Sequence, residues 1–159
     1  SMKRVGYEGK DIYLYKVRTM YPYAQYLQEF LYHKFKLQSG GKFKNDFRII
    51  PWGNFLRSTW IDELPQFFNL LKGEIKLVGV RSISNHYFSL YPKEAQELRI
   101  QVKPGIIPPF YVDMPKTFEE IVDSEMKYIR EYKKNPTLTD MKYLFQAFYN
   151  IIFRHARSA

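Results

Sequence analysis

The stretch from Arg57 to Gly73 constrains the fold of this chain more than any other. It reads R-S-T-W-I-D-E-L-P-Q-F-F-N-L-L-K-G. Its apolar residues recur at the i, i+3, i+4, i+7 spacing of a helix with one buried face: Leu64, Phe67, Phe68 and Leu71. Pro65 fits only in the first turn, because proline breaks a helix interior. Gly73 supplies the stop. We therefore predict a helix here whose apolar face is buried.

An acidic pair, Asp62 and Glu63, directly precedes Pro65 at the start of this helix. Free backbone N–H groups and the helix dipole favour anions at that position. In one interpretation Asp62 caps the helix and Glu63 is an ordinary first-turn acid. In the other, the adjacent carboxylates divide the chemistry, one attacking a phosphorus and the other holding a divalent metal. The pair by itself leaves both interpretations open.

Composition limits the partners of this chain. Its 159 residues suffice for one domain with a real core. A net charge of +9 favours an anionic partner, such as nucleotide phosphates, nucleic acid or an anionic lipid surface. The 14 Tyr and 13 Phe mixed with Lys and Arg favour a membrane interface. There is no cysteine, so disulfide and thiolate chemistry are excluded. No apolar run approaches the roughly 20 residues of a transmembrane helix.

Local patterns predict a mostly helical domain with a few short strands. The strands are expected at residues 12–17 and 74–80. The helices besides the central one are expected at residues 23–35, 85–90, 93–102, 118–133 and 141–154. Residues 43–52 are basic and irregular, and the prolines in residues 106–115 predict a rigid loop.

The last predicted helix carries an apolar face flanked by aromatic residues and basic ends. The apolar residues are Leu144, Phe145, Phe148, Ile151 and Ile152. This face could pack on the core of the domain. It could instead lie in the plane of a membrane, with the basic ends near anionic headgroups. Both can hold if the helix uses one face for each.

Basic residues are spread around the acidic pair. Those able to bind phosphate are Lys16, Arg18, Arg48, Arg57, Arg81, Arg99 and Lys103. Arginine grips phosphate bidentately, and lysine does so as a point charge. A diphosphate substrate with Mg²⁺ would require such a cluster with carboxylates between its members. The three histidines have no spacing that suggests zinc.

Several collinear motifs carry a family resemblance. Around the acidic pair the chain reads R-x-x-x-x-D-E-L-P-Q, then N-x-L-K-G-E and L-V-G-x-R. Residues 16–20 read K-V-R-T-M, residues 46–57 contain D-F-R and end in G-N-F-L-R, and residues 99–106 read R-I-Q-V-K-P-G-I. This set closely resembles the bacterial sugar transferases, the monotopic polyprenyl-phosphate phosphoglycosyl transferases.

The resemblance implies a fold and an activity. The expected fold is a single α-rich α+β domain over residues 1–159, with a few short strands and amphipathic interfacial helices. No G-x-G-x-x-G follows a predicted strand, so a dinucleotide-binding fold is not expected. Such enzymes move a sugar phosphate from a UDP-sugar to polyprenyl (undecaprenyl) phosphate and release UMP. This is the first membrane step in assembling exopolysaccharide, capsule or O-antigen-type glycans.

Carried over position by position, the resemblance assigns roles to residues. Asp62 would be the nucleophile, forming a covalent aspartyl phospho-sugar in a ping-pong sequence, and Glu63 would hold Mg²⁺. Arg81 would bind phosphate. The family's other basic positions would have a general role in phosphate binding or scaffold support: Lys16, Arg18, Arg48, Arg57 and Arg99. The expected partners are a UDP-sugar, polyprenyl phosphate and the membrane surface.

The resemblance also implies a location and has two departures. Residues 1–2 resemble a remnant of recombinant expression, and a membrane segment is expected upstream, placing the protein at the cytoplasmic face of the bacterial inner membrane. Val80 and Ser82 stand where most of the family has prolines around the arginine. Residues 104–109 read P-G-I-I-P-P where the family reads P-G-I-T-G, so Pro108, followed by Pro109, stands in place of a glycine. Both changes bear on how the neighbouring loops run, and neither touches the acidic pair.

Two other functions are compatible with these residues. A basic module that docks on anionic lipid or nucleic acid without chemistry would carry the same charge but would not need the acidic pair. No nucleic-acid-binding motif is visible, so a nucleic-acid partner is not expected. A degenerate family member would keep the scaffold without turnover, and release of UMP would distinguish it from an active enzyme.

Overall fold

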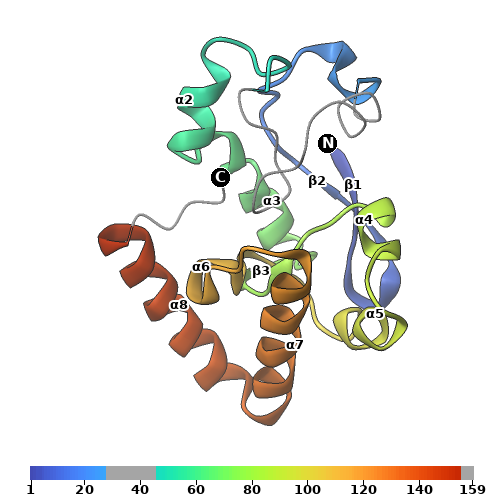
Figure 1. Ribbon diagram of the computed structural model, residues 1–159, viewed down its shortest axis with the longest axis vertical. Coiled ribbons are helices and arrows are strands. Elements are labelled where there is room, and N and C mark those ends of the chain that lie inside the picture. The colour runs from blue at the N-terminus through green and yellow to red at the C-terminus, as the bar shows by residue number, and fades with distance from the viewer. Residues whose placement is uncertain (28–45, 155–159) are drawn as a thin grey trace.

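The computed structural model describes residues 1–27 and 46–154 of the chain (Figure 1). It is α-rich with two small sheets, as predicted. The described α-helices are α2 (Gly53–Ser58), α3 (Gln66–Leu71), α4 (Asn85–Ser89), α5 (Lys93–Arg99), α6 (Phe110–Asp113), α7 (Phe118–Lys134) and α8 (Pro136–Phe153). Short 3-10 helices are η1 (Tyr7–Gly9), η2 (Pro22–Gln25) and η3 (Ile61–Glu63). The helix predicted over residues 23–35 lies mostly outside the described residues.

The first sheet is an antiparallel hairpin of β1 (Met2–Val5) and β2 (Asp11–Leu14). Its turn passes through η1, where Gly9 has a φ of 72° that glycine adopts readily. The sequence predicted β2, although as residues 12–17, and did not predict β1. A hydrogen bond from Val5 N–H to the Ile83 carbonyl, 3.0 Å long, attaches the hairpin to the segment just before α4.

The second sheet is parallel and has the order β3-β5-β4. Its strands are β3 (Lys76–Val78), β4 (Val80–Arg81) and β5 (Pro104–Ile107). Gly79 and Gly105 let the backbones meet, since a Cβ on Gly105 would lie 2.1 Å from the Gly79 nitrogen. The rigid loop predicted over residues 106–115 is therefore wrong, because these residues end β5 and then form α6. Proline at Pro109, the N-cap position, is compatible with a helix start.

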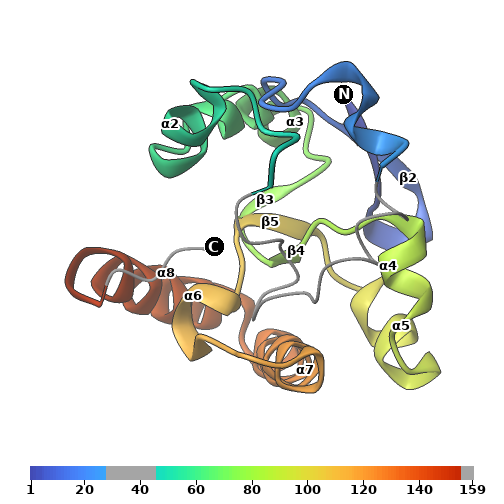
Figure 2. The same ribbon diagram turned by 45° about the horizontal axis from the view of Figure 1, so that its top comes forward.

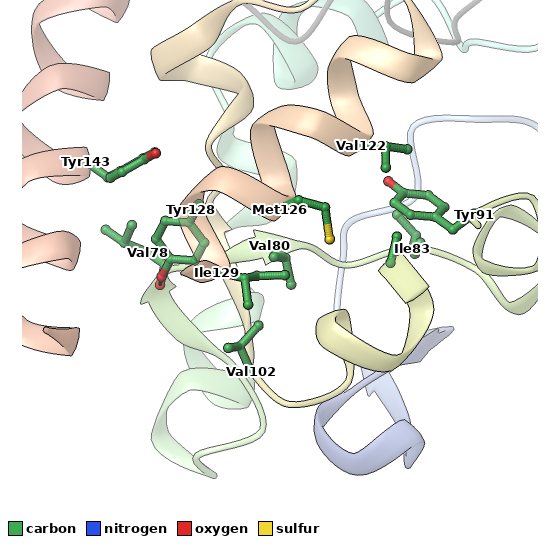
Figure 3. Packing of buried hydrophobic residues seen from close by; sticks show 11 residues of the cluster. Val78, Val80, Ile83, Tyr91, Val102, Val122, Met126, Tyr128, Ile129 and Tyr143 are labelled. Carbon is green, nitrogen blue, oxygen red and sulfur yellow. Dashed lines mark hydrogen bonds between the residues drawn. The ribbon is translucent and has the colours of Figure 1, made fainter. Parts of the chain in front are cut away.

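The main core lies between this sheet and α5 and α7 (Figure 3). Figure 3 shows Met126, Tyr128 and Ile129 of α7 beside Val78 and Val80 of the strands. The α7 helix starts at a capping box in which Thr117 and Glu120 satisfy each other's backbone N–H groups. Its predicted bounds, residues 118–133, differ from the observed ones by one residue. Helices α4 and α5 also occur where the sequence predicted them.

Helix α8 begins earlier than the predicted residue 141. Asn135 caps it by accepting a hydrogen bond from Leu138 N–H (3.1 Å), and Pro136 occupies the first turn. The buried side chains of α8 include Tyr143, Ala147 and Asn150. Its exposed residues include the large apolar side chains Phe145, Phe148, Tyr149, Ile152 and Phe153. The helix thus packs on the core with one face and leaves an apolar face uncovered. No helix among the described residues is long and apolar enough to cross a membrane.

The central helix is α3, and its orientation corrects the sequence prediction. It follows Pro65 and ends before Gly73, whose φ is 70°, as expected. The four apolar residues of the predicted face are nevertheless on the outside, and Leu70 instead packs against the buried Ile12, Leu14 and Ile75. Leu64, Phe67, Phe68 and Leu71 are 57–68% exposed. The buried positions of α3 are the polar residues Gln66 and Asn69. In Figure 2, α2 and α3 lie on one side of the parallel sheet, and α6, α7 and α8 lie on the other.

Candidate active site

Asp62 lies in η3. This 3-10 helix directly follows Trp60, whose backbone is left-handed with a φ of 57°. The side chain of Asp62 is 1% exposed and caps neither η3 nor α3, so the capping interpretation is wrong. The Asp62 carbonyl accepts a 2.9 Å hydrogen bond from Val17 N–H. This bond fixes η3 against the segment that carries Lys16.

Lys16 bridges the two carboxylates. Its Nζ lies 2.9 Å from Asp62 Oδ2 and 2.9 Å from Glu63 Oε1. The contact with Glu63 is a hydrogen bond, whereas Asp62 Oδ2 has no hydrogen-bond donor among the described residues. A buried acceptor without a donor costs free energy of folding. Among the described residues, Asp62 Oδ2 is therefore a buried carboxylate oxygen that is held by the charge of Lys16 and by no hydrogen bond.

Asn69 holds α3 against the hairpin beside this group. It is 0% exposed and accepts a hydrogen bond from Tyr15 N–H (3.0 Å). Its amide donates to the Tyr13 carbonyl (2.9 Å) and to Glu74 Oε2 (2.6 Å). These bonds place the residue that follows Tyr15, Lys16, next to the acidic pair. The sequence analysis did not single out Asn69 as a site residue, and its only signal was the motif N-x-L-K-G-E.

A pocket of about 120 Å³ opens beside the carboxylates. Residues of β1, β2, η3, α3, β4, β5 and α6 line it, and the polar ones are Arg4, Lys16, Glu63, Gln66, Arg81, Ser82 and Tyr111. Typical ligand pockets span roughly 300–1,000 Å³. The described residues thus enclose room for a phosphate-sized part of a ligand rather than a whole nucleotide sugar.

Arg81 reaches this pocket from β4, with its backbone held on both sides. Its N–H donates to Glu125 Oε1 (3.1 Å), and its carbonyl accepts from the Arg99 guanidinium. Pairing of β4 with β5 adds to this anchoring. The backbone of Arg81 is thus fixed by the sheet and by Glu125, although neither Val80 nor Ser82 is a proline.

The other predicted basic residues lie elsewhere. Arg99 is buried and pairs with Glu125 at 2.8 Å. Burial opposes its charge, but the Glu125 carboxylate outweighs that effect and raises the pKa of Arg99. Arg48 is buried and pairs with Asp46 at 2.6 Å. These two placements agree with scaffold support.

Arg18 and Arg57 do not line the pocket. The structure therefore brings Lys16 and Arg81 to the acidic pair and leaves the remaining predicted arginines outside it. It also adds Arg4, which the sequence analysis did not single out.

The donor set is compatible with a hard cation. Glu63 contributes a carboxylate to the pocket, and Asp62 Oδ2 is a buried oxygen without a hydrogen bond. Such oxygens suit Mg²⁺. Within residues 1–27 and 46–154, no group of three or more His, Asp or Glu side chains is arranged to hold a metal by itself. A cation here would share its coordination with substrate or water, as Mg²⁺ commonly does.

Comparisons with known proteins agree with the motifs. A family model described as bacterial sugar transferase matches residues 1–154. Galactosyl transferase CpsE of Streptococcus agalactiae is 36% identical over 136 residues, which are 83% of this chain and 30% of that protein. Undecaprenyl-phosphate galactose phosphotransferase of Salmonella typhimurium is 35% identical over 150 residues, 91% of this chain and 31% of that protein.

A third relative differs in the sugar that its name gives. UDP-glucose:undecaprenyl-phosphate glucose-1-phosphate transferase of Escherichia coli is 33% identical over 143 residues, 81% of this chain and 28% of that protein. The chain thus spans about a third of the length of these three relatives.

Proposed function

This chain belongs to the bacterial sugar transferase family, and from that premise we propose that it transfers a sugar 1-phosphate from a UDP-sugar to polyprenyl phosphate and releases UMP. The product would start the assembly of a surface polysaccharide. The observation that carries the proposal is Asp62, a buried carboxylate that Lys16 holds beside Glu63, next to a pocket lined by cationic side chains. The relatives' names supply the two substrates.

The proposed reaction has two balanced half-reactions. In the first, an Asp62 carboxylate oxygen attacks the phosphorus that carries the sugar. A new O–P bond forms, the bond between this phosphorus and the bridging oxygen breaks, and UMP leaves with the electron pair. In the second, an oxygen of polyprenyl phosphate attacks the same phosphorus and the Asp62 carboxylate is released. The product is a polyprenyl diphosphate sugar.

The surrounding residues would support both steps. Lys16 contacts both carboxylates and so holds them close together. Arg81 supplies a guanidinium for phosphate oxygens in the same pocket. Glu63 would hold Mg²⁺, with Asp62 beside it. That cation would neutralise negative charge on the phosphates, which a modest nucleophile such as a carboxylate needs.

The exposed apolar residues support a membrane surface as the place of the second step. Leu64, Phe67, Phe68 and Leu71 around α3 are exposed within a few residues of Asp62. Aromatic and aliphatic side chains of this kind insert into the headgroup region of a bilayer. A lipid acceptor would then meet the pocket without leaving the membrane. The proposed location is the cytoplasmic face of the bacterial inner membrane.

The experiment that tests the proposal examines the first half-reaction alone. The protein is incubated with Mg²⁺ and a panel of UDP-sugars without lipid, and intact mass spectrometry and UMP release are measured. We expect a mass increase equal to one sugar phosphate, with one UMP per protein. Asp62→Asn should reduce adduct formation at least about a thousandfold, because the amide is not a nucleophile.

The matched control is Asp123→Asn, which makes the same chemical change on the exposed face of α7. It should form adduct at the rate of the unchanged protein. An adduct that persists in Asp62→Asn would refute the assignment of the nucleophile. The absence of adduct and UMP with every donor, in a folded sample that includes any upstream segment, would favour a degenerate or purely binding member of the family.

A further inference from the structure

Two guanidinium groups share the candidate active-site pocket, and no described carboxylate is ion-paired with either of them. Arg4 comes from β1 and Arg81 from β4, and both line the pocket beside Glu63. Among the described residues, neither side chain lies within ion-pair distance of a carboxylate. The hydrogen bonds of Arg4 to described residues stay within its own strand and go to the Lys3 carbonyl and to Met2 Sδ, each 3.4 Å.

The position of Arg4 is a consequence of the hairpin rather than of a flexible side chain alone. Arg4 pairs with Ile12 across the hairpin, and the next residue, Val5, donates its N–H to the Ile83 carbonyl. Ile83 is only two positions after Arg81 in the chain, so this bond brings β1 close to Arg81. Neighbouring strand residues point to opposite faces. Accordingly Lys3 turns away and pairs with Asp11 at 2.7 Å.

The pair is electrostatically unfavourable as it stands. Burial lowers the pKa of Arg4, and the positive charge of Arg81 lowers it further. Lys16 does not relieve this repulsion, because it is itself a cation and it contacts the Asp62 and Glu63 carboxylates. A half-buried like-charge pair persists at a cost in stability, and an anionic ligand between the two groups would offset that cost.

We propose that Arg4 and Arg81 together bind the diphosphate of the nucleotide sugar, so that Arg4 is a substrate-binding residue supplied by the N-terminal hairpin. The identity of this ligand rests on the proposed function. The charges match in number, since a sugar nucleotide presents two ionised phosphates to two guanidiniums. Arg81 alone would leave one of the two phosphates without a guanidinium partner, because Lys16 is already paired with the acidic residues.

The test compares Arg4→Gln, Arg4→Lys and the neighbouring Lys3→Gln, which removes one positive charge from the opposite face of the same strand. Calorimetry measures binding of UDP and of pyrophosphate to each protein. We expect Arg4→Gln to weaken both about tenfold, since a hydrogen bond to a charged group is worth roughly that factor. Arg4→Lys should recover part of the loss, and Lys3→Gln should stay within about twofold of the unchanged protein.

Thermal unfolding without ligand gives a second reading. Arg4→Gln relieves the repulsion with Arg81, so its midpoint should equal or exceed that of the unchanged protein. Saturating UDP should then raise the midpoint of Arg4→Gln less than that of the unchanged protein. A purely structural arginine would give a lower midpoint without ligand and an unchanged affinity.

The outcomes separate this inference from the proposed function. The role of Arg4 is overturned if Arg4→Gln binds UDP and pyrophosphate as tightly as the unchanged protein, or if Lys3→Gln loses as much affinity as Arg4→Gln. Adduct formation would still support the transferase in either case. Binding of pyrophosphate that depends on Arg4, without any binding of UDP, supports Arg4 and overturns the nucleotide donor. Binding of neither anion overturns both.

Discussion

Helices α3 and α7 have the same kind of sequence pattern and opposite relations to the interior. In α7, the apolar residues Val122, Met126 and Ile129 are buried and contribute to the main core. In α3, Phe67 and Phe68 are exposed, and the polar residue Asn69 is 0% exposed. Apolar periodicity therefore identifies both helices but does not tell which face lies inside.

The difference follows from what each helix contacts. α7 packs on the β3-β5-β4 sheet and α5, which present apolar side chains. α3 packs on the hairpin edge near Tyr13 and Tyr15, where backbone N–H and C=O groups need partners. Asn69 supplies those partners, and Leu70 packs on the buried side chains of the hairpin, whereas Phe67 and Phe68 remain exposed. We therefore expect α3 to contribute mainly to the candidate site and to a contact surface, and α7 to contribute mainly to the stability of the fold.

The largest expected effect on stability is on the α7 side. Ile129→Ala removes a 0% exposed side chain from the main core and leaves a cavity. The free energy of unfolding should fall by about 2–5 kcal/mol, measured by urea denaturation. The rate of adduct formation per folded molecule should stay unchanged, because Ile129 does not line the pocket.

Arg130→Ala is the control, since Arg130 is the exposed neighbour of Ile129 on the same helix. It should change stability by less than about 0.5 kcal/mol. An Ile129→Ala protein that is as stable as this control would show that the apolar face of α7 does not form the core.

A smaller loss of stability with a larger loss of activity is expected on the α3 side. Asn69→Ala leaves Tyr15 N–H, the Tyr13 carbonyl and Glu74 without their present partner. The free energy of unfolding should fall by about 1–3 kcal/mol. Adduct formation per folded molecule should also fall, about tenfold or more, because the segment that carries Lys16 is no longer fixed to α3.

The exposed Asn54 of α2 gives the matched control. Asn54→Ala should leave both quantities unchanged. If Asn69→Ala lowered stability and kept full activity, α3 would be a structural element like α7. That result would contradict the different roles that we assign to the two helices.

The elements that the sequence predicts well are those whose signals are local. The Thr117 cap with Glu120, the Ser84 cap of α4 and the Pro65–Gly73 bounds of α3 all involve residues within one or two turns. β1 and β5 depend on partners distant in the chain, such as Leu14 for Met2. Their pairing cannot be read from residues 2–5 or 104–107 alone, so β1 was missed and β5 was predicted as loop.

The site divides in the same way. The motif predicts Asp62, Glu63 and Arg81. In the structure Glu63 and Arg81 line one pocket, and Asp62 lies behind it, paired with the lining residue Lys16. The motif does not show that Asp62 is buried, because its burial follows from the left-handed turn at Trp60 and the contact with Lys16. Arg4 resembles every other basic residue in the sequence, and only the hairpin's attachment beside β4 distinguishes it.

The smallest expected effect on stability tests what the exposed face of α3 is for. Phe67→Ser with Leu71→Ser should change the free energy of unfolding by less than about 0.5 kcal/mol per site, since both side chains are more than half exposed. Cosedimentation with vesicles containing anionic lipid should nevertheless show binding reduced about tenfold or more, because burying each side chain in the interface contributes roughly 1 kcal/mol.

Leu90→Ser provides the control, because Leu90 is 53% exposed and follows α4, on the opposite side of the molecule from α2 and α8 in both views (Figures 1 and 2). It should leave vesicle binding unchanged. Equal binding by the double serine variant and this control would mean that the apolar residues of α3 do not touch lipid. Loss of binding confined to the double variant would show that the apolar face of α3 contacts the bilayer. The bilayer would then give α3 the apolar surroundings that the protein core gives α7.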